Sequence, residues 1–117
     1  MMKAVIAIAA VLLSNSALAA DYRPLQGEYA IGGKTLFDAP PDEAQNTHLY
    51  VDLEGTAAHD LYEALPGPAR VGVCGGSKDL TKRSGSVQCT LDKAAKEYHC
   101  AFGIELRTQR VVDGVVC

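Results

Sequence analysis

The residues best suited to chemistry in this chain are four cysteines, Cys74, Cys89, Cys100 and Cys117, all in its C-terminal part. They are separated by 14, 10 and 16 residues. Zinc sites usually contain close pairs of cysteines or histidines, with two to five residues between the two ligands. The spacing here contains no such pair of cysteines. It therefore predicts two disulfides and no metal site, as expected for a chain that folds in an oxidising compartment.

Three pairings of four cysteines are possible, and the sequence favours Cys74–Cys89 with Cys100–Cys117. The stretch between Cys74 and Cys89 is polar and offers almost nothing to a core. A disulfide across a loop of this length stabilises by about 3 kcal/mol. The second link would hold the C-terminal residues, which otherwise fray. The nested alternative, Cys89–Cys100 with Cys74–Cys117, remains open, because Cys89 and Cys100 would sit on one hairpin.

The segment after Cys74 is the best candidate for recognition. Successive backbone amides in a glycine-rich loop can bind an anion, and basic side chains nearby would strengthen that binding. Loops held by a rigid scaffold often carry binding functions. We therefore predict a candidate binding loop made of Gly75, Gly76, Ser77, Lys78, Lys82 and Arg83.

The three histidines do not form a catalytic group in the sequence. His48 alternates with apolar neighbours and is expected on the solvent face of a strand. His59 and Glu63 are four residues apart on a predicted helix, which is a common surface pair. His99 alternates away from the apolar positions of its strand.

Other catalytic motifs are also incomplete. The run from Gly32 to Thr35 resembles the end of a phosphate-binding loop, but Glu28 stands where that motif requires glycine. Ser77 and Ser84 have no assignable base. The sequence thus predicts a protein that is not an enzyme and needs no cofactor.

The N-terminal residues have the organisation of a secretory signal peptide. Lys3 precedes an apolar run over residues 4–13, and Ala17 and Ala19 are small residues at the −3 and −1 positions of a cleavage site. A membrane-spanning helix needs about 20 apolar residues, so this run is too short to be one. We expect residues 1–19 to be removed, residues 20–117 to form one domain, and the protein to be periplasmic or secreted.

Charge limits the class of partner. Without Lys3 the chain has ten basic and fourteen acidic side chains. Binding to nucleic acid depends on neutralising phosphates with basic residues, so a nucleic-acid partner is not expected. Acidic residues concentrate before position 64 and basic ones after it. Such a split can steer a charged protein partner, here an extracytoplasmic one.

The elements that must position these residues follow from hydrophobic periodicity. Residues 27–31 and 34–37 are predicted to form a hairpin around Gly32-Gly33. Strict alternation predicts a strand over residues 47–53. Apolar residues then recur with helical spacing up to Leu65, so a helix capped by Thr56 is expected, ended by the prolines that follow. The apolar stripe of this helix is Ala58, Leu61, Tyr62 and Leu65.

The C-terminal half is predicted to form further strands. A short strand is expected over residues 71–74, followed by the polar loop, and a hairpin by 86–91 with 97–106. Residues 110–117 are rich in β-branched valine and contain an Asp-Gly turn, so a last strand or a tight hairpin is expected there. The fold class is therefore α+β: a small antiparallel sheet of five to seven short strands with one helix packed on a face, and two disulfides.

Small size, predicted export and an even number of cysteines make the chain similar in type to periplasmic lysozyme inhibitors and to immunity proteins against secreted toxins. That similarity implies a non-catalytic protein-binding module. The alternatives are an envelope structural or stress protein with no enzyme target, and a small enzyme. No motif in the sequence identifies the partner.

Overall fold

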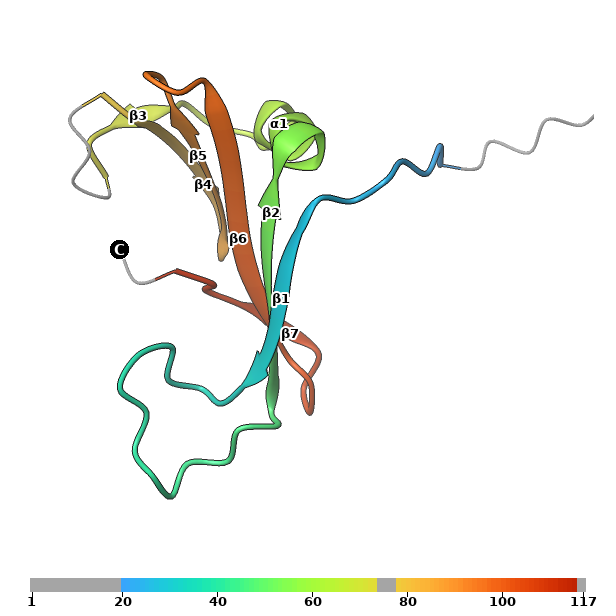
Figure 1. Cartoon of the computed structure of the whole chain (residues 1–117), viewed down its shortest axis with the longest axis vertical. Coiled ribbons are helices and arrows are strands. Elements are labelled where there is room, and N and C mark those ends of the chain that lie inside the picture. The colour runs from blue at the N-terminus through green and yellow to red at the C-terminus, as the bar shows by residue number, and fades with distance from the viewer. Residues whose placement is uncertain (1–19, 74–77, 116–117) are drawn as a thin grey trace, which may run out of the picture.

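A computed structural model describes residues 20–73 and 78–115 of the chain. These residues form seven strands and one helix: β1 (Gly27–Gly32), β2 (His48–Glu54), α1 (Gly55–Ala64), β3 (Arg70–Val71), β4 (Leu80–Ser84), β5 (Val87–Asp92), β6 (Glu97–Glu105) and β7 (Arg110–Val112). Residues 20–26 extend away from this body (Figure 1).

The strands form one antiparallel sheet in the order β1-β2-β6-β5-β4-β3, and β7 pairs with β6 (Figure 1). One edge of β6 pairs with β2 from Glu54↔His99 to His48↔Glu105. Its other edge is shared, since β5 pairs with the first half of β6 and β7 with the second half. The predicted α+β class, with a small antiparallel sheet and one helix, is confirmed.

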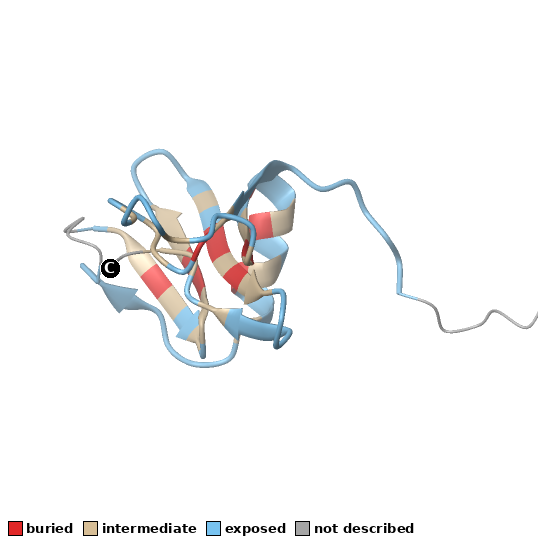
Figure 2. Ribbon diagram, turned by 90° about the horizontal axis from the view of Figure 1, so that it is seen from below, coloured by how far each residue is buried: buried red, intermediate tan, exposed pale blue. Residues whose placement is uncertain are grey.

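Helix α1 follows β2 directly and packs on one face of the sheet. Ala58 and Tyr62 are buried, and Leu61 and Leu65 pack against the same cluster, so the predicted apolar stripe is confirmed. The predicted cap is wrong: Thr56 lies within the helix, whose N-cap is Glu54, and no side chain caps its first turn. Figure 2 shows buried residues on α1 and on strands of the sheet.

The disulfide of the described chain joins Cys89 to Cys100. The predicted Cys74–Cys89 and Cys100–Cys117 pairs are therefore wrong. The physical reason is register: Cys89 on β5 and Cys100 on β6 lie directly opposite each other, with their Cα atoms 4.0 Å apart. Cys74 and Cys117 lie outside the described residues, so the prediction of a second disulfide is not tested.

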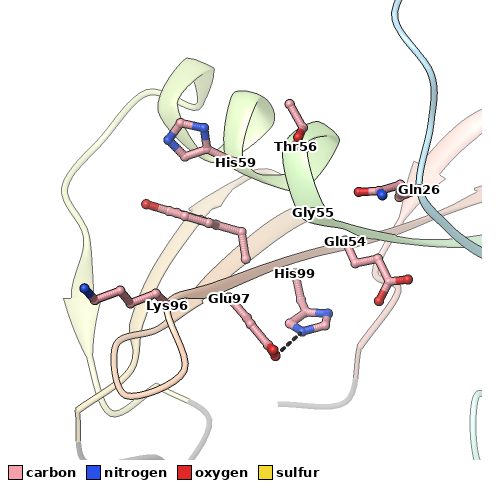
Figure 3. Close-up of a pocket in the computed structure, with 9 residues that line it drawn as sticks. Gln26, Glu54, Gly55, Thr56, His59, Lys96, Glu97 and His99 are labelled. Carbon is pink, nitrogen blue, oxygen red and sulfur yellow. Dashed lines mark ion pairs between the residues drawn. The ribbon is translucent and has the colours of Figure 1, made fainter.

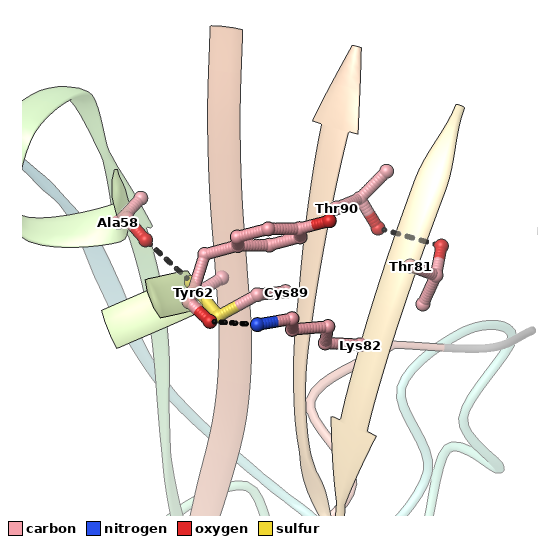
Figure 4. Close-up of a disulfide and its surroundings, with 7 residues drawn as sticks. Ala58, Tyr62, Thr81, Lys82, Cys89 and Thr90 are labelled. Atoms are coloured by element: carbon pink, nitrogen blue, oxygen red, sulfur yellow. Dashed lines mark hydrogen bonds between the residues drawn. A yellow bond between two sulfur atoms is a disulfide. The ribbon is translucent and has the colours of Figure 1, made fainter. Parts of the chain in front are cut away.

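This disulfide lies at the centre of the core (Figure 4). Cys89 and Cys100 are 0% and 1% exposed, and they are the largest fully buried side chains of the described residues. Cys100 Sγ lies 3.3 Å from the carbonyl oxygen of Ala58, so α1 rests directly on the sulfur atoms. In a core with few large side chains, the disulfide supplies packing as well as a covalent link.

The predicted hairpin around Gly32-Gly33 does not form. Residues 27–32 pair instead with β2, across a loop over residues 33–47. Gly33 is buried within this loop: its N–H donates to Gln45 Oε1 at 3.2 Å, and its carbonyl accepts a hydrogen bond from the Tyr50 hydroxyl. These long-range contacts outweigh the local preference of the glycine pair for a tight turn.

The predicted loop between Cys74 and Cys89 contains strand β4. Its Thr81 is buried, and the Thr81 and Thr90 hydroxyls lie 3.3 Å apart on neighbouring strands. Gly85 turns the chain into β5 with a φ of 58°, in the left-handed region that favours glycine. Short polar residues pair well here although they carry no hydrophobic alternation.

Candidate interaction surface

The predicted binding loop is not assembled by the described residues. Gly75, Gly76 and Ser77 lie outside them, and Lys78 is exposed beside them. Lys82 and Arg83 belong to β4 and make internal contacts.

Lys82 stabilises the end of the helix. Its Nζ donates to the Tyr62 carbonyl at 3.1 Å and lies 4.8 Å from the centroid of the Tyr62 ring (Figure 4). The last carbonyls of a helix have no partner within it, and a cation there is favourable. This lysine therefore acts in folding and is not free for an anion.

Arg83 faces the other side of the sheet and ties the C-terminal segment to it. Its guanidinium donates to Asp113 Oδ1 at 2.5 Å and to Gln88 Oε1 at 3.0 Å. Gly114 then crosses the backbone of Phe102 so closely that a Cβ at this glycine would lie 2.5 Å from Phe102 N. Residues 113–115 thus help to cover the sheet face opposite α1.

His48 is not on a solvent face as the alternation predicted, because it is only 7% exposed. Its Nδ1 lies 2.7 Å from Thr47 Oγ1, and that hydroxyl donates to the Gly32 carbonyl at 3.5 Å. The ring also stacks on Tyr50, with centroids 5.7 Å apart. These contacts close the base of the 33–47 loop, so His48 has a structural role there.

A cavity of about 560 Å³ lies between the N-terminal end of α1 and the start of β6 (Figure 3). His59 and His99 line this cavity. Both side chains are exposed, which agrees with their predicted place on the surface. His59 lies 3.7 Å from Glu63, and His99 lies 3.9 Å from Glu97. Each histidine has its own acidic neighbour, and the two rings do not converge on one point. Among the described residues, this arrangement offers local contacts between a histidine and a carboxylate and no catalytic dyad.

A second cavity, of about 610 Å³, borders the 33–47 loop and is lined by residues that include Glu43 and His48. Glu43 accepts hydrogen bonds from the hydroxyl and the N–H of Thr35, at 2.6 and 3.3 Å. These bonds lower the pKa of the Glu43 carboxyl. Desolvation, together with the nearby Glu43 charge, raises the pKa of the Tyr50 hydroxyl. The Glu43 carboxylate thus joins the two sides of the 33–47 loop by hydrogen bonds.

Metal-binding clusters of three or more histidine, cysteine, aspartate or glutamate side chains are absent from residues 20–73 and 78–115. Within the same ranges, no helix has the length and apolar character needed to cross a membrane.

The most distinctive surface is half of the sheet face on which α1 packs. Two rows of apolar residues cross the strands there in register: Ile31↔Leu49↔Ile104↔Val111 and Tyr29↔Val51↔Phe102. Tyr29 is 76% exposed, Ile31 53% and Val111 52%. The other members are half-buried. We call these side chains the open apolar face: Tyr29, Ile31, Leu49, Val51, Phe102, Ile104 and Val111.

The length of the helix explains why this half is open. A helix of ten residues spans about 15 Å, whereas a strand of nine residues such as β6 spans about 30 Å. Helix α1 packs on the row that contains Leu53 and the disulfide, and Val51 and Phe102 of the next row are half-buried against the same cluster. Tyr29, Ile31 and Val111, further from this cluster, are exposed. Contiguous exposed apolar surface of this kind marks interaction sites.

Sequence reasoning placed the residues of this face on strands but did not recognise them as a site. The shared face of Tyr98, Cys100, Phe102 and Ile104 was predicted correctly, as was that of Leu49, Val51 and Leu53. The signal that could have revealed this face is a difference in length: the one predicted helix is shorter than the longest strand with alternating apolar residues, so it cannot cover the whole sheet face. No protein-family model, curated protein or solved structure matches the chain, so its function must be inferred from its own residues.

Proposed function

We propose that this protein is an exported, non-catalytic protein-binding module that recognises its partner through the open apolar face. The supporting observation is the exposure of Tyr29, Ile31 and Val111 on one sheet face, next to half-buried apolar neighbours. Such a surface is costly to leave in water, and a partner that covers it gains the hydrophobic free energy of burial. The inhibitor or immunity type of function fits this arrangement.

The alternatives have less support in the described residues. A small enzyme would need titratable groups that converge in a cavity, whereas His59, His99 and Glu43 are each held by local partners. The described residues offer no separate observation that favours an envelope structural or stress protein, whereas the open apolar face supports the binding proposal.

Export is part of the proposal. Removal of residues 1–19 would leave a chain that oxidises outside the cytoplasm, where disulfides persist. Since Cys89 is linked to Cys100, we propose that Cys74 and Cys117 form the second disulfide. Peptide mapping of the exported protein without reductant should recover a fragment that joins these two residues. Free thiols at both positions would contradict it.

In-cell photo-crosslinking tests the binding function. A photoreactive amino acid replaces Ile104, at the centre of the open apolar face, and a control chain carries it at Ala69, which is exposed between α1 and β3. We expect a discrete heteromeric adduct from position 104 and none from position 69. The captured protein should then bind the purified domain, and its activity should change on binding.

Equal labelling from both positions, or an adduct that shows no binding to the purified domain, would overturn the proposed function. The melting temperature of each variant verifies that it is folded before it is used. Since Ile104 is half-buried, a folding defect there would shift the test to Val111, which is more exposed on the same row.

A further inference from the structure

Strand β1 is an edge of the sheet, and the direction of its backbone groups can be assigned. It pairs only with β2 among the described strands. The Glu54 N–H donates to the Gln26 carbonyl at 3.1 Å, and the Thr47 N–H donates to the Gly32 carbonyl at 3.0 Å. Even-numbered residues therefore direct their backbone groups toward β2. In a strand the direction alternates, so Gly27, Tyr29 and Ile31 direct theirs outward.

This edge lacks the features that usually prevent strands from pairing. Natural edge strands are protected by lysines, prolines, bulges or short length. Residues 27–32 include no lysine, arginine or proline, and all six pair with β2 in continuous register. Each of the three outward-facing residues offers one donor and one acceptor. The edge is thus competent to accept another strand.

The two faces of this edge differ in chemistry. On one face, Tyr29 and Ile31 extend the open apolar face to the boundary of the sheet. On the other face, Glu28 lies directly opposite Asp52, and Glu54 follows two residues further along β2. All three carboxylates are exposed, and none forms an ion pair with a described residue. Like charges directly opposite in a sheet are unfavourable, so basic side chains beside them would relieve this repulsion.

From these contacts we propose that β1 binds an extended segment of a partner protein in which apolar and basic side chains alternate. The segment adds a strand to the sheet by hydrogen bonding to Gly27, Tyr29 and Ile31. Its apolar side chains lie beside Tyr29 and Ile31, and its basic side chains lie beside Glu28 and Asp52. This inference rests on the proposed binding function and specifies which part of the partner is recognised.

A second copy of the chain fits this edge less well than a basic segment does. Pairing two β1 strands would bring a second Glu28 to the face that already carries Asp52 and Glu54. The sequence beyond residue 19 also has an excess of acidic over basic residues. The carboxylates at this edge and the net negative charge of the chain both oppose self-association and favour a cationic strand.

The test uses a six-residue peptide of alternating lysine and valine, with a peptide of alternating glutamate and valine as its control. Both are titrated into the isotope-labelled mature domain. We expect the lysine peptide to shift the amide signals of Tyr29 and Ile31, and to slow their hydrogen exchange. The glutamate peptide should leave these signals unchanged.

Four variants separate the contributions of backbone and charge. Ile31→Pro removes an outward N–H without touching the β1–β2 ladder and should abolish the response, while Ile31→Ala retains the donor and should preserve the slowed exchange at Tyr29. Glu28→Gln should weaken lysine-peptide binding by about two- to fivefold, the range of a cross-strand charge pair. Glu63→Gln, an exposed acid on α1, should leave the affinity unchanged.

Equal responses to the two peptides, or shifts located away from β1, would overturn this inference. So would a doubling of the mass of the free domain, with Tyr29 and Ile31 amides protected, because a second copy would then occupy the edge. If position 104 still captures a partner in cells, the proposed function survives that result. If neither experiment gives binding, both fall.

Discussion

The two halves of one sheet face differ in how far their apolar side chains are buried. In the covered half, Leu53, Cys89 and Cys100 are buried beneath Ala58 and Tyr62 of α1. In the other half, the rows that contain Tyr29 and Ile31 continue across β1, β2 and β6, and Tyr29 and Ile31 are exposed. Stability is concentrated in one part of this surface, and the recognition that we propose uses the adjacent part. The end of a single short helix marks their boundary.

Two tyrosines test this division most strongly, because the same truncation should have opposite consequences in the two halves. Tyr62→Ala removes a buried ring that contacts the Tyr98 ring edge-on at 5.2 Å, and it should lower the free energy of unfolding by about 3–5 kcal/mol. Tyr29→Ala removes a ring that is 76% exposed and should change it by less than about 0.5 kcal/mol. Urea unfolding of both variants provides the measurement. Similar losses in the two would refute the division.

The disulfide gives the next largest effect. Replacing Cys89 and Cys100 together by alanine should destabilise the domain by about 3 kcal/mol, from lost loop closure alone. For a domain of this size, that loss lowers the melting temperature by about 10–20 °C. Calorimetry measures the shift, and the Tyr29→Ala variant serves as the control from the open half.

A melting temperature within a few degrees of the parent would mean that the link contributes little to the covered half. Ala58, which rests on Cys100, would then have to pack equally well on the two alanines.

The smallest expected effect is a local pH-dependent change in the 33–47 loop. Hydrogen bonds from Thr35 lower the pKa of Glu43 below its ordinary value of 4.5. A carboxyl whose pKa is lowered on folding stabilises the fold above its ordinary pKa and loses this contribution as the pH falls through the lowered one. We therefore expect the Thr35 amide shift to change below pH 4.5, with little change in Tyr98 of the covered half. Glu43→Gln should abolish the transition at Thr35. An unaltered titration in that variant would assign it to another group.

Much of the fold could be predicted from local patterns. Alternation located β2, the β5–β6 hairpin and most of β6, and the 3.6-residue period located α1. These elements could be predicted because each buries one face, so apolar residues recur in the sequence with the period of the helix or the strand. The polar strand β4 could not be found in this way, because Thr81 and Thr90 pair through hydroxyls without an apolar alternation.

Long-range pairing was the main obstacle. Gly32 and Gly33 have local turn preferences, but residues 27–32 gain more by pairing with β2. The cysteine pairing depends in the same way on the β5–β6 register, which places Cys89 opposite Cys100. The open apolar face also depends on long-range pairing, since its rows exist only once β1, β2, β6 and β7 are aligned. The candidate binding loop stays a prediction, because Gly75, Gly76 and Ser77 lie outside the described residues. The sequence did not reveal that Lys82 and Arg83 belong to a strand.

The position of β6 has a consequence for how the chain is made. Among the described strands it alone joins the β1–β2 side of the sheet to the β5–β4–β3 side. It occupies residues 97–105 of 117. During synthesis the earlier strands therefore have no central strand to assemble on until most of the polypeptide has left the ribosome. The last fifth of the sequence therefore controls when the sheet can be completed. The export that we propose would benefit from such a delay, because a polypeptide that threads a translocation channel does so before it folds.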